Sequence, residues 1–228
     1  MSRGSAAAKR RDGGFTLIEV LVATSLFSLL TGLLATMVIQ MVQSNAGTRA
    51  RLSATEQLRV GMDSMTKGLR TAVRPEQVNA ACTSTPSWNC TSPFLAASAQ
   101  LVSFYANFGD AAGPRLTTYR VEEDPDRAGT GRLVEEQQGA ALPAASPSLA
   151  CAAGCVSRTL AEDIPWPVSA AAPVFAFRDG TGAVLTTSAA DLARVATVVV
   201  SLPVNGGRGY AASSATSTVF LPNSVMGR

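Results

Sequence analysis

The feature that most limits how this chain can fold is an apolar stretch near its N-terminus. Residues 15–42 are almost all apolar or small, and no charged side chain occurs between Glu19 and Arg49. A helix rises about 1.5 Å per residue, so this stretch exceeds the roughly 20 residues that span the hydrocarbon core of a bilayer. The sequence therefore predicts a membrane-spanning helix over residues 15–42.

The charges that precede this stretch predict its direction in the membrane. Residues 1–14 hold one acidic side chain, Asp12, and four basic ones: Arg3, Lys9, Arg10 and Arg11. Basic flanks stay on the cytoplasmic side, so we expect a cytoplasmic N-terminus and an exported C-terminal head. Removing these residues takes four of the 19 basic and one of the 16 acidic side chains, which leaves 15 of each. The formal charge of +3 thus indicates membrane orientation rather than nucleic-acid binding.

Glu19 is the one acidic residue inside the apolar stretch. A carboxylate in lipid costs at least a few kcal/mol unless it is neutralised, so such a residue indicates function. Cleavage after Gly14 would create a free amine on Phe15, about one helical turn from Glu19. An ion pair could then form within one chain or between neighbouring chains. A protonated carboxyl, or one that reaches the headgroups, is the alternative.

The segment Gly14 to Val20, which reads GFTLIEV, resembles the class III signal of type IV pilins and type II secretion pseudopilins. The resemblance implies cleavage after Gly14 by a prepilin peptidase and methylation of the new Phe15 amine. It implies that Glu19 neutralises a neighbouring subunit's amine during filament assembly. The implied partners are other pilins or pseudopilins, membrane lipid, and an inner-membrane assembly platform with its ATPase.

The order of a long helix followed by short β-like segments resembles the minor subunits of the PilW- and PulJ-like type, as do the stretches at residues 102–105, 175–180 and 222–223. Major pilins commonly carry a proline where this chain has Thr36. The expected protein is thus a subunit of a pilus or secretion pseudopilus that primes or caps the filament, located in the inner membrane and then in a surface or periplasmic filament. A filament-presented adhesin or a DNA-uptake subunit is the alternative function.

A second helical segment is expected to follow the membrane helix. Apolar residues recur mostly at steps of three and four over residues 43–74, which is typical of an amphipathic helix; they are Leu52, Leu58, Met62, Met65, Leu69 and Val73. Arg74-Pro75 should end it, because the residue before proline avoids helical geometry. Six basic residues between Arg49 and Arg74 leave a nucleic-acid partner open, although a solvated helix face explains them.

Residues 75–228 are expected to form a β-rich globular head. Short β-like segments alternate there with Gly, Pro, Asp and Ser clusters; they are residues 100–108, 115–121, 132–136, 174–177, 183–187, 195–203 and 216–221. The predicted fold class is α+β, with a long N-terminal helix whose amphipathic second half packs on an antiparallel sheet. The domain prediction is a leader at residues 1–14, a membrane or filament-core helix at 15–42, an amphipathic helix at 43–74 and the head.

The four cysteines of the exported head predict disulfides. Of the three connectivities, local pairs Cys82–Cys90 and Cys151–Cys155 are expected, because each closes a short loop. A four-cysteine zinc site is the alternative.

The composition argues against an enzyme. The chain has no histidine, which excludes the serine and cysteine catalytic arrangements that depend on it, and no catalytic residue is predicted. No cofactor is predicted either. One acidic cluster leaves calcium open, because carboxylate oxygens are its preferred ligands; it contains Glu122, Glu123, Asp124 and Asp126.

Overall fold

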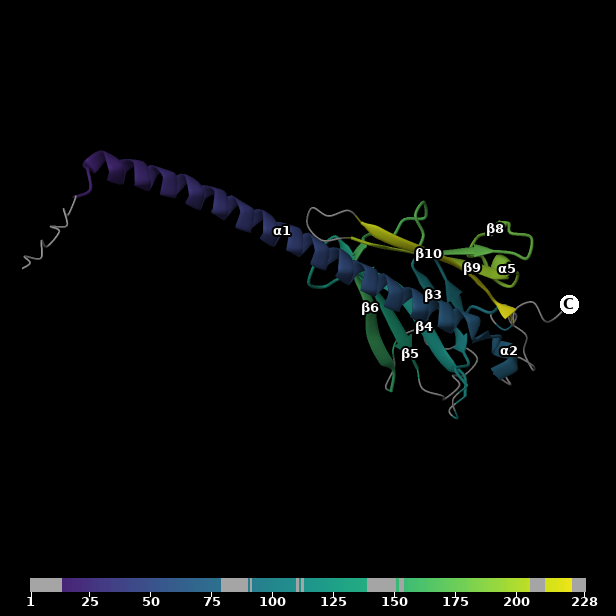
Figure 1. Cartoon of the computed structure of the whole chain (residues 1–228). Helices are drawn as coiled ribbons and strands as arrows, with labels where there is room; N and C mark the ends of the chain where they lie inside the picture. The colour runs from purple at the N-terminus through teal and green to yellow at the C-terminus, as the bar shows by residue number, and fades with distance from the viewer. Residues whose placement is uncertain are drawn as a thin grey trace, which may run out of the picture. The chain divides into compact units, whose positions relative to one another are not determined.

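The structure is a computed structural model that describes residues 14–78, 90, 92–109, 111, 113–138, 151, 154–205 and 212–222. A long helix, α1 (Leu17–Arg70), precedes strands that form two antiparallel sheets (Figure 1). The α+β class with an N-terminal helix and an antiparallel head is therefore confirmed. The chain divides into two compact units, Met1–Thr48 and Arg49–Arg228.

Helix α1 is continuous because proline is absent from Leu17 to Arg70. Its first turn is capped by Thr16, whose Oγ1 accepts a hydrogen bond from the backbone N–H of Glu19 at 3.4 Å. The helix ends at Arg70, earlier than the predicted residue 74. Ala72 and Val73 instead form a short strand, β1 (Ala72–Val73), which pairs with Tyr105 and Ala106. The hydrogen bonds of this pairing outweigh the helical pattern of the sequence.

The first sheet has six strands in the order β1-β3-β4-β5-β6, with β2 also paired to β3. Every pair in it is antiparallel. Its remaining strands are β2 (Ala96–Ala97), β3 (Leu101–Ala106), β4 (Arg115–Glu123), β5 (Thr130–Gln137) and β6 (Val156–Pro165).

The second sheet has four antiparallel strands in the order β10-β9-β7-β8. They are β7 (Phe175–Arg178), β8 (Val184–Leu185), β9 (Thr197–Val204) and β10 (Ser213–Phe220). Two single-turn helices, α2 (Pro75–Val78) and α5 (Ala189–Leu192), complete the described elements. All seven predicted β segments contain a strand.

One face of the second half of α1 joins the core of the head. Ala54, Leu58, Met65 and Leu69 are buried in the same apolar cluster as residues from both sheets. Leu52, which the pattern placed on this face, is instead 65% exposed. Ala54 lies on the buried face instead. From Ala54 onward, buried residues of the helix recur at steps of three or four.

Two glycines lie on this buried face. A Cβ atom at Gly61 would meet Leu202 Cδ2 at 3.0 Å, and one at Gly68 would meet the Tyr119 hydroxyl at 2.4 Å. The helix can therefore approach the strands closely only because these positions lack a side chain.

Strand β6 has no counterpart among the predicted segments. The first four of its residues are exposed, and Arg158, Glu162 and Asp163 make the sequence polar. Its pairing with β5 is irregular at Leu133. A polar edge strand with an interrupted register lacks the apolar alternation by which strands are predicted.

Candidate processing and assembly site

The predicted cleavage position lies just outside the first helix. Gly14, Phe15 and Thr16 precede Leu17 without regular secondary structure, and no neighbouring atom lies within 4 Å of a Cβ built on Gly14. Phe15 is 82% exposed. A peptide bond in such a segment can extend into a protease groove without unfolding a helix.

Glu19 lies on the same side of the helix as Phe15. The two residues line one hollow of about 470 Å³, together with Val20, Ala23, Thr24 and Phe27. Apart from Glu19 and Thr24, the lining is apolar. A carboxylate here is thus close to the residue that cleavage after Gly14 would make N-terminal.

The first half of α1 exposes an unusual amount of apolar surface. Large apolar side chains from Leu17 to Val42 are each at least half exposed. Among the described helices, α1 alone is long and apolar enough to cross a membrane, with a mean hydropathy of 2.1 in its most apolar window. Apolar exposure on this scale indicates a lipid or protein environment rather than water.

The hydroxyl side chains of this half are satisfied within the helix. Each donates to a backbone carbonyl three or four residues earlier, at 2.8–3.0 Å; they are Thr24, Ser25, Ser28, Thr31 and Thr36. Such internal bonds remove the cost of placing a hydroxyl in hydrocarbon. The segment can therefore enter an apolar environment without leaving these donors unpaired.

A comparison with protein families supplies the deciding observation. Residues 9–35 match the family described as the prokaryotic N-terminal methylation motif. The chain carries the prepilin-type motif of the type IV pilin and pseudopilin family. Neither the search of curated proteins nor that of solved structures found a match.

The prepilin-type motif contains all three residues of the predicted processing and assembly site. Gly14, Phe15 and Glu19 lie within the matched range. The motif belongs to structural filament proteins, and in general it implies processing by a prepilin peptidase, assembly with other pilin subunits and membrane anchoring. The resemblance to prepilin-type proteins is thus confirmed for the N-terminal motif, whereas the likeness to the PilW- and PulJ-like subunits stays a prediction.

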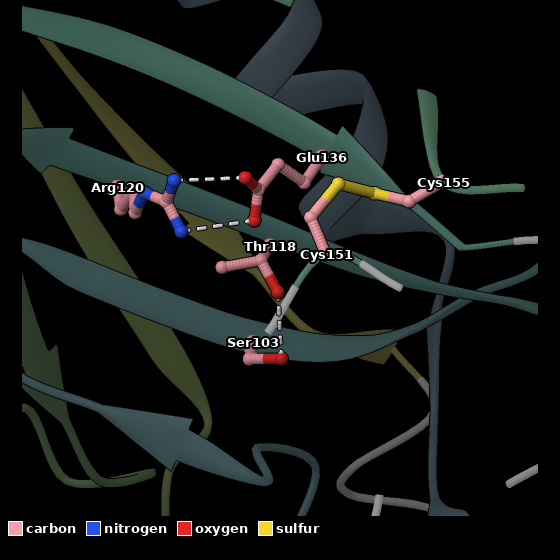
Figure 2. Close-up of a disulfide and its surroundings, with 6 residues drawn as sticks. All are labelled: Ser103, Thr118, Arg120, Glu136, Cys151 and Cys155. Atoms are coloured by element: carbon pink, nitrogen blue, oxygen red, sulfur yellow. Dashed lines mark hydrogen bonds and ion pairs between the residues drawn. A yellow bond between two sulfur atoms is a disulfide. The ribbon is translucent and has the colours of Figure 1, made fainter. Parts of the chain in front are cut away.

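One of the two predicted disulfides is confirmed. Cys151 and Cys155 are bonded, with their Cα atoms 5.4 Å apart (Figure 2). Cys90 is also in a disulfide, whereas Cys82 lies outside the described residues, so the pair Cys82–Cys90 stays a prediction. Cysteines in disulfides supply no thiolate, which rules out the four-cysteine zinc alternative in this structure.

Four polar side chains on β3, β4 and β5 are paired across the strands. Figure 2 shows Ser103 and Thr118 joined by a hydrogen bond of 2.9 Å and Arg120 joined to Glu136 by two contacts, of 2.8 and 3.1 Å. Ser103, Thr118 and Glu136 are cross-strand neighbours. Because their partners satisfy them, these groups indicate a structural role in the sheet.

The carboxylates of the acidic cluster, residues 122–126, do not share a common partner. Glu122 accepts hydrogen bonds from Arg120 and Arg132, at 2.7–2.9 Å. Asp124 accepts one from the backbone N–H of Asp126 in a turn, and the side chain of Glu123 is exposed. Within the described ranges, no group of three or more His, Cys, Asp or Glu side chains is arranged to hold a metal ion.

We expect Glu122 to make the stability of the head depend on acid pH. Burial opposes its ionisation, but the hydrogen bonds and charges of Arg132 and Arg120 outweigh burial and lower its pKa. A lowered pKa stabilises the fold above the usual carboxyl value, and this stability is lost as pH falls through the folded-state value. Glu122→Gln should therefore cost about 1 kcal/mol at pH 7 and less at pH 3.

Urea unfolding of the full chain in detergent at the two pH values measures this difference. Glu123→Gln is the matched control, because its side chain is exposed. An equal loss at both pH values for Glu122→Gln would contradict the pairing.

The basic residues of the second half of α1 are mostly exposed. They are Arg49, Arg51, Arg59, Lys67 and Arg70. Arg74 lies beyond the helix and forms an ion pair with Glu76 at 3.2 Å. This arrangement agrees with a solvated helix face.

Sequence reasoning missed a buried polar network where α1 meets the first sheet. The Tyr119 hydroxyl lies 2.9 Å from the Ser64 carbonyl oxygen and 3.0 Å from Glu135 Oε1. Glu135 also pairs with Arg158, and burial, followed by the charge of Glu135, raises the pKa of Tyr119. The one sequence signal for this network is Gly68, because a glycine inside a helix indicates that another group packs closely against it. That group is Tyr119.

Proposed function

We propose that this chain is a processed, membrane-anchored filament subunit. A prepilin peptidase would cleave after Gly14, and the new amine of Phe15 would be methylated. The observation that carries the proposal is the match of residues 9–35 to the methylation motif. The exposed, non-helical Gly14–Thr16 segment supports it, because a peptidase can reach this bond.

The mature chain would be held by α1 with its N-terminal end toward the cytoplasm. The basic leader supports this direction, and the exposed apolar side chains of residues 17–42 support an environment of lipid or packed helices. The head would then be exported from the inner membrane. Disulfides in the head support an oxidising compartment.

Glu19 would set the register of assembly. Its carboxylate shares a mostly apolar hollow with Phe15, where a neighbouring amine would be its natural counter-charge. A charge left unpaired there costs several kcal/mol, so neighbouring chains would be held at the axial position that pairs it.

The subunit would occupy a minor position that primes or caps a type IV pilus or a type II secretion pseudopilus. The head of residues 75–228 is bulky, and a bulky head favours a sparse or terminal place in a helical array. The partners would be other pilins or pseudopilins, the prepilin peptidase, and the assembly platform with its ATPase. The function is structural, with no cofactor.

A substitution of Glu19 tests the assembly step. We expect the Glu19→Gln variant to be cleaved normally. About tenfold less of the partner subunits should be isolated together with it, which corresponds to a loss of about 1.4 kcal/mol in the free energy of association. The measurement is quantitative mass spectrometry of complexes isolated from membranes. Ser28→Ala is the matched control, since Ser28 is an exposed polar residue of the same helix that bonds only within it. Undiminished recovery for Glu19→Gln would contradict the role of the carboxylate.

A further inference from the structure

Strand β10 is an open edge of the second sheet. Among the described strands it pairs with β9 alone, over all eight of its residues and without a register shift. Its sequence, SSATSTVF, contains neither a charged residue nor a proline. The side chains of Ser214, Thr216, Thr218 and Phe220 are exposed.

One hydrogen bond shows which backbone groups face outward. Just beyond the strand, the N–H of Leu221 donates to the carbonyl oxygen of Ala196 at 3.0 Å. Residues of an antiparallel strand alternate between its two neighbours. The odd-numbered residues of β10 therefore bond to β9, and the N–H and C=O groups of Ser214, Thr216, Thr218 and Phe220 point to the open side.

The other edges of the described sheets are blunted. Strands β1 and β8 have two residues each. Strand β6 pairs irregularly, carries charged residues, ends at Pro165, and has a left-handed backbone at Asp163 with φ of 56°. Short length, charge, proline and irregular backbone are the features that keep a sheet edge from pairing with another strand. Strand β10 has none of them.

We propose that β10 accepts an extended, uncharged segment of another polypeptide, added as an antiparallel strand. Antiparallel addition continues the arrangement of this sheet, in which every pair is antiparallel. A charged side chain opposite Thr216 or Thr218 would find no counter-charge on β10. Hydroxyl and β-branched side chains pair well with threonine across strands.

Phe220 selects a different polypeptide over a second copy of this chain. Its ring is 71% exposed at the end of the open edge. In a self-pairing of β10, Phe220 would face Ala212, Ser214 or Thr216, depending on the register. A partner strand with a large apolar side chain at that place buries the ring and gains more from the hydrophobic effect.

Hydrogen exchange of the full chain in detergent micelles tests the open edge first. We expect the amides of residues 215, 217 and 219 to exchange slowly, and those of Thr216 and Thr218 to exchange at least about tenfold faster. Equal protection of both sets in the chain alone would overturn the proposal, because the edge would then be covered already.

A synthetic peptide then tests the partner. The probe is a blocked peptide with the β9 sequence, residues 197–204, changed by Thr197→Ile to face Phe220 and by Pro203→Thr to restore an N–H. We expect it to slow the exchange of Thr216 and Thr218 about tenfold and to leave the odd-numbered amides unchanged. The control peptide carries Val199→Lys and Ser201→Lys in addition, and it should have no effect.

Substitutions in β10 test whether the peptide acts by adding a strand to this edge rather than by binding elsewhere on the chain. Thr216→Pro removes an outward N–H without touching the β9 ladder and should abolish the peptide effect, whereas Thr216→Val should retain it. If Thr216→Pro also exposes the odd-numbered amides, Thr218→Lys replaces it, because an edge lysine blocks strand addition. An unaffected exchange rate with the neutral peptide, or slow exchange that depends only on the concentration of the chain, would overturn the proposal.

Discussion

Phe94→Ala is expected to lower the free energy of unfolding of the head by about 3–5 kcal/mol. The Phe94 ring is fully buried and lies edge-on to Phe104 of β3 at 5.9 Å and to Phe177 of β7 at 5.6 Å. It therefore joins the two sheets at the centre of the core. Its removal leaves a cavity that neither sheet can fill without moving.

Urea unfolding of the full chain in detergent, followed by circular dichroism, measures this loss. Phe220→Ala is the matched control, because the same side chain is removed from a site where it is 71% exposed. The control should change stability by less than about 0.5 kcal/mol. Equal effects of the two substitutions would show that Phe94 does not connect the sheets.

Gly68→Ala is expected to lower the stability of the head by about 2 kcal/mol, although alanine favours helices over glycine by about 1 kcal/mol. The new methyl group would lie 2.4 Å from the Tyr119 hydroxyl. Tyr119 is fully buried and held by the Ser64 carbonyl and Glu135, so it cannot move away without breaking those bonds. Either α1 must separate from the sheet or the polar network must break.

Two other glycines of the same helix provide the comparison, again by urea unfolding. Gly61→Ala should cost less, because its nearest neighbour is the flexible end of Leu202 at 3.0 Å. Gly32→Ala should leave the unfolding of the head unchanged, since nothing lies within 4 Å of a Cβ at Gly32. A loss for Gly61→Ala greater than that for Gly68→Ala would contradict the close approach at Tyr119.

The elements that the sequence predicts well are those with a strong local pattern. The apolar stretch and the absence of proline are sufficient to predict a long helix, and valine-rich β9 satisfies the strand pattern on its own. The proposed processing site is also local, because Gly14, Phe15 and Glu19 lie within six consecutive residues. Its recognition required no tertiary structure.

The features that the sequence does not predict depend on contacts between distant segments. The helix stops at Arg70 because Ala72 pairs with Ala106, and Leu52 is exposed because Ala54 faces the core instead. The network around Glu135 joins residues from a helix and three strands, so no spacing along the chain indicates it. The open edge of β10 became visible only when the order of the strands was known.

The proposed cleavage after Gly14 is tested most directly by the mass and sequence of the mature N-terminus. The chain should be purified from bacterial membranes that contain a prepilin peptidase and analysed by tandem mass spectrometry. We expect a first residue of Phe15 with one methyl group on its amine, and Gly14→Leu should leave the leader attached. A mature chain that starts at any other residue, or a leader still removed from Gly14→Leu, would contradict the proposed cleavage.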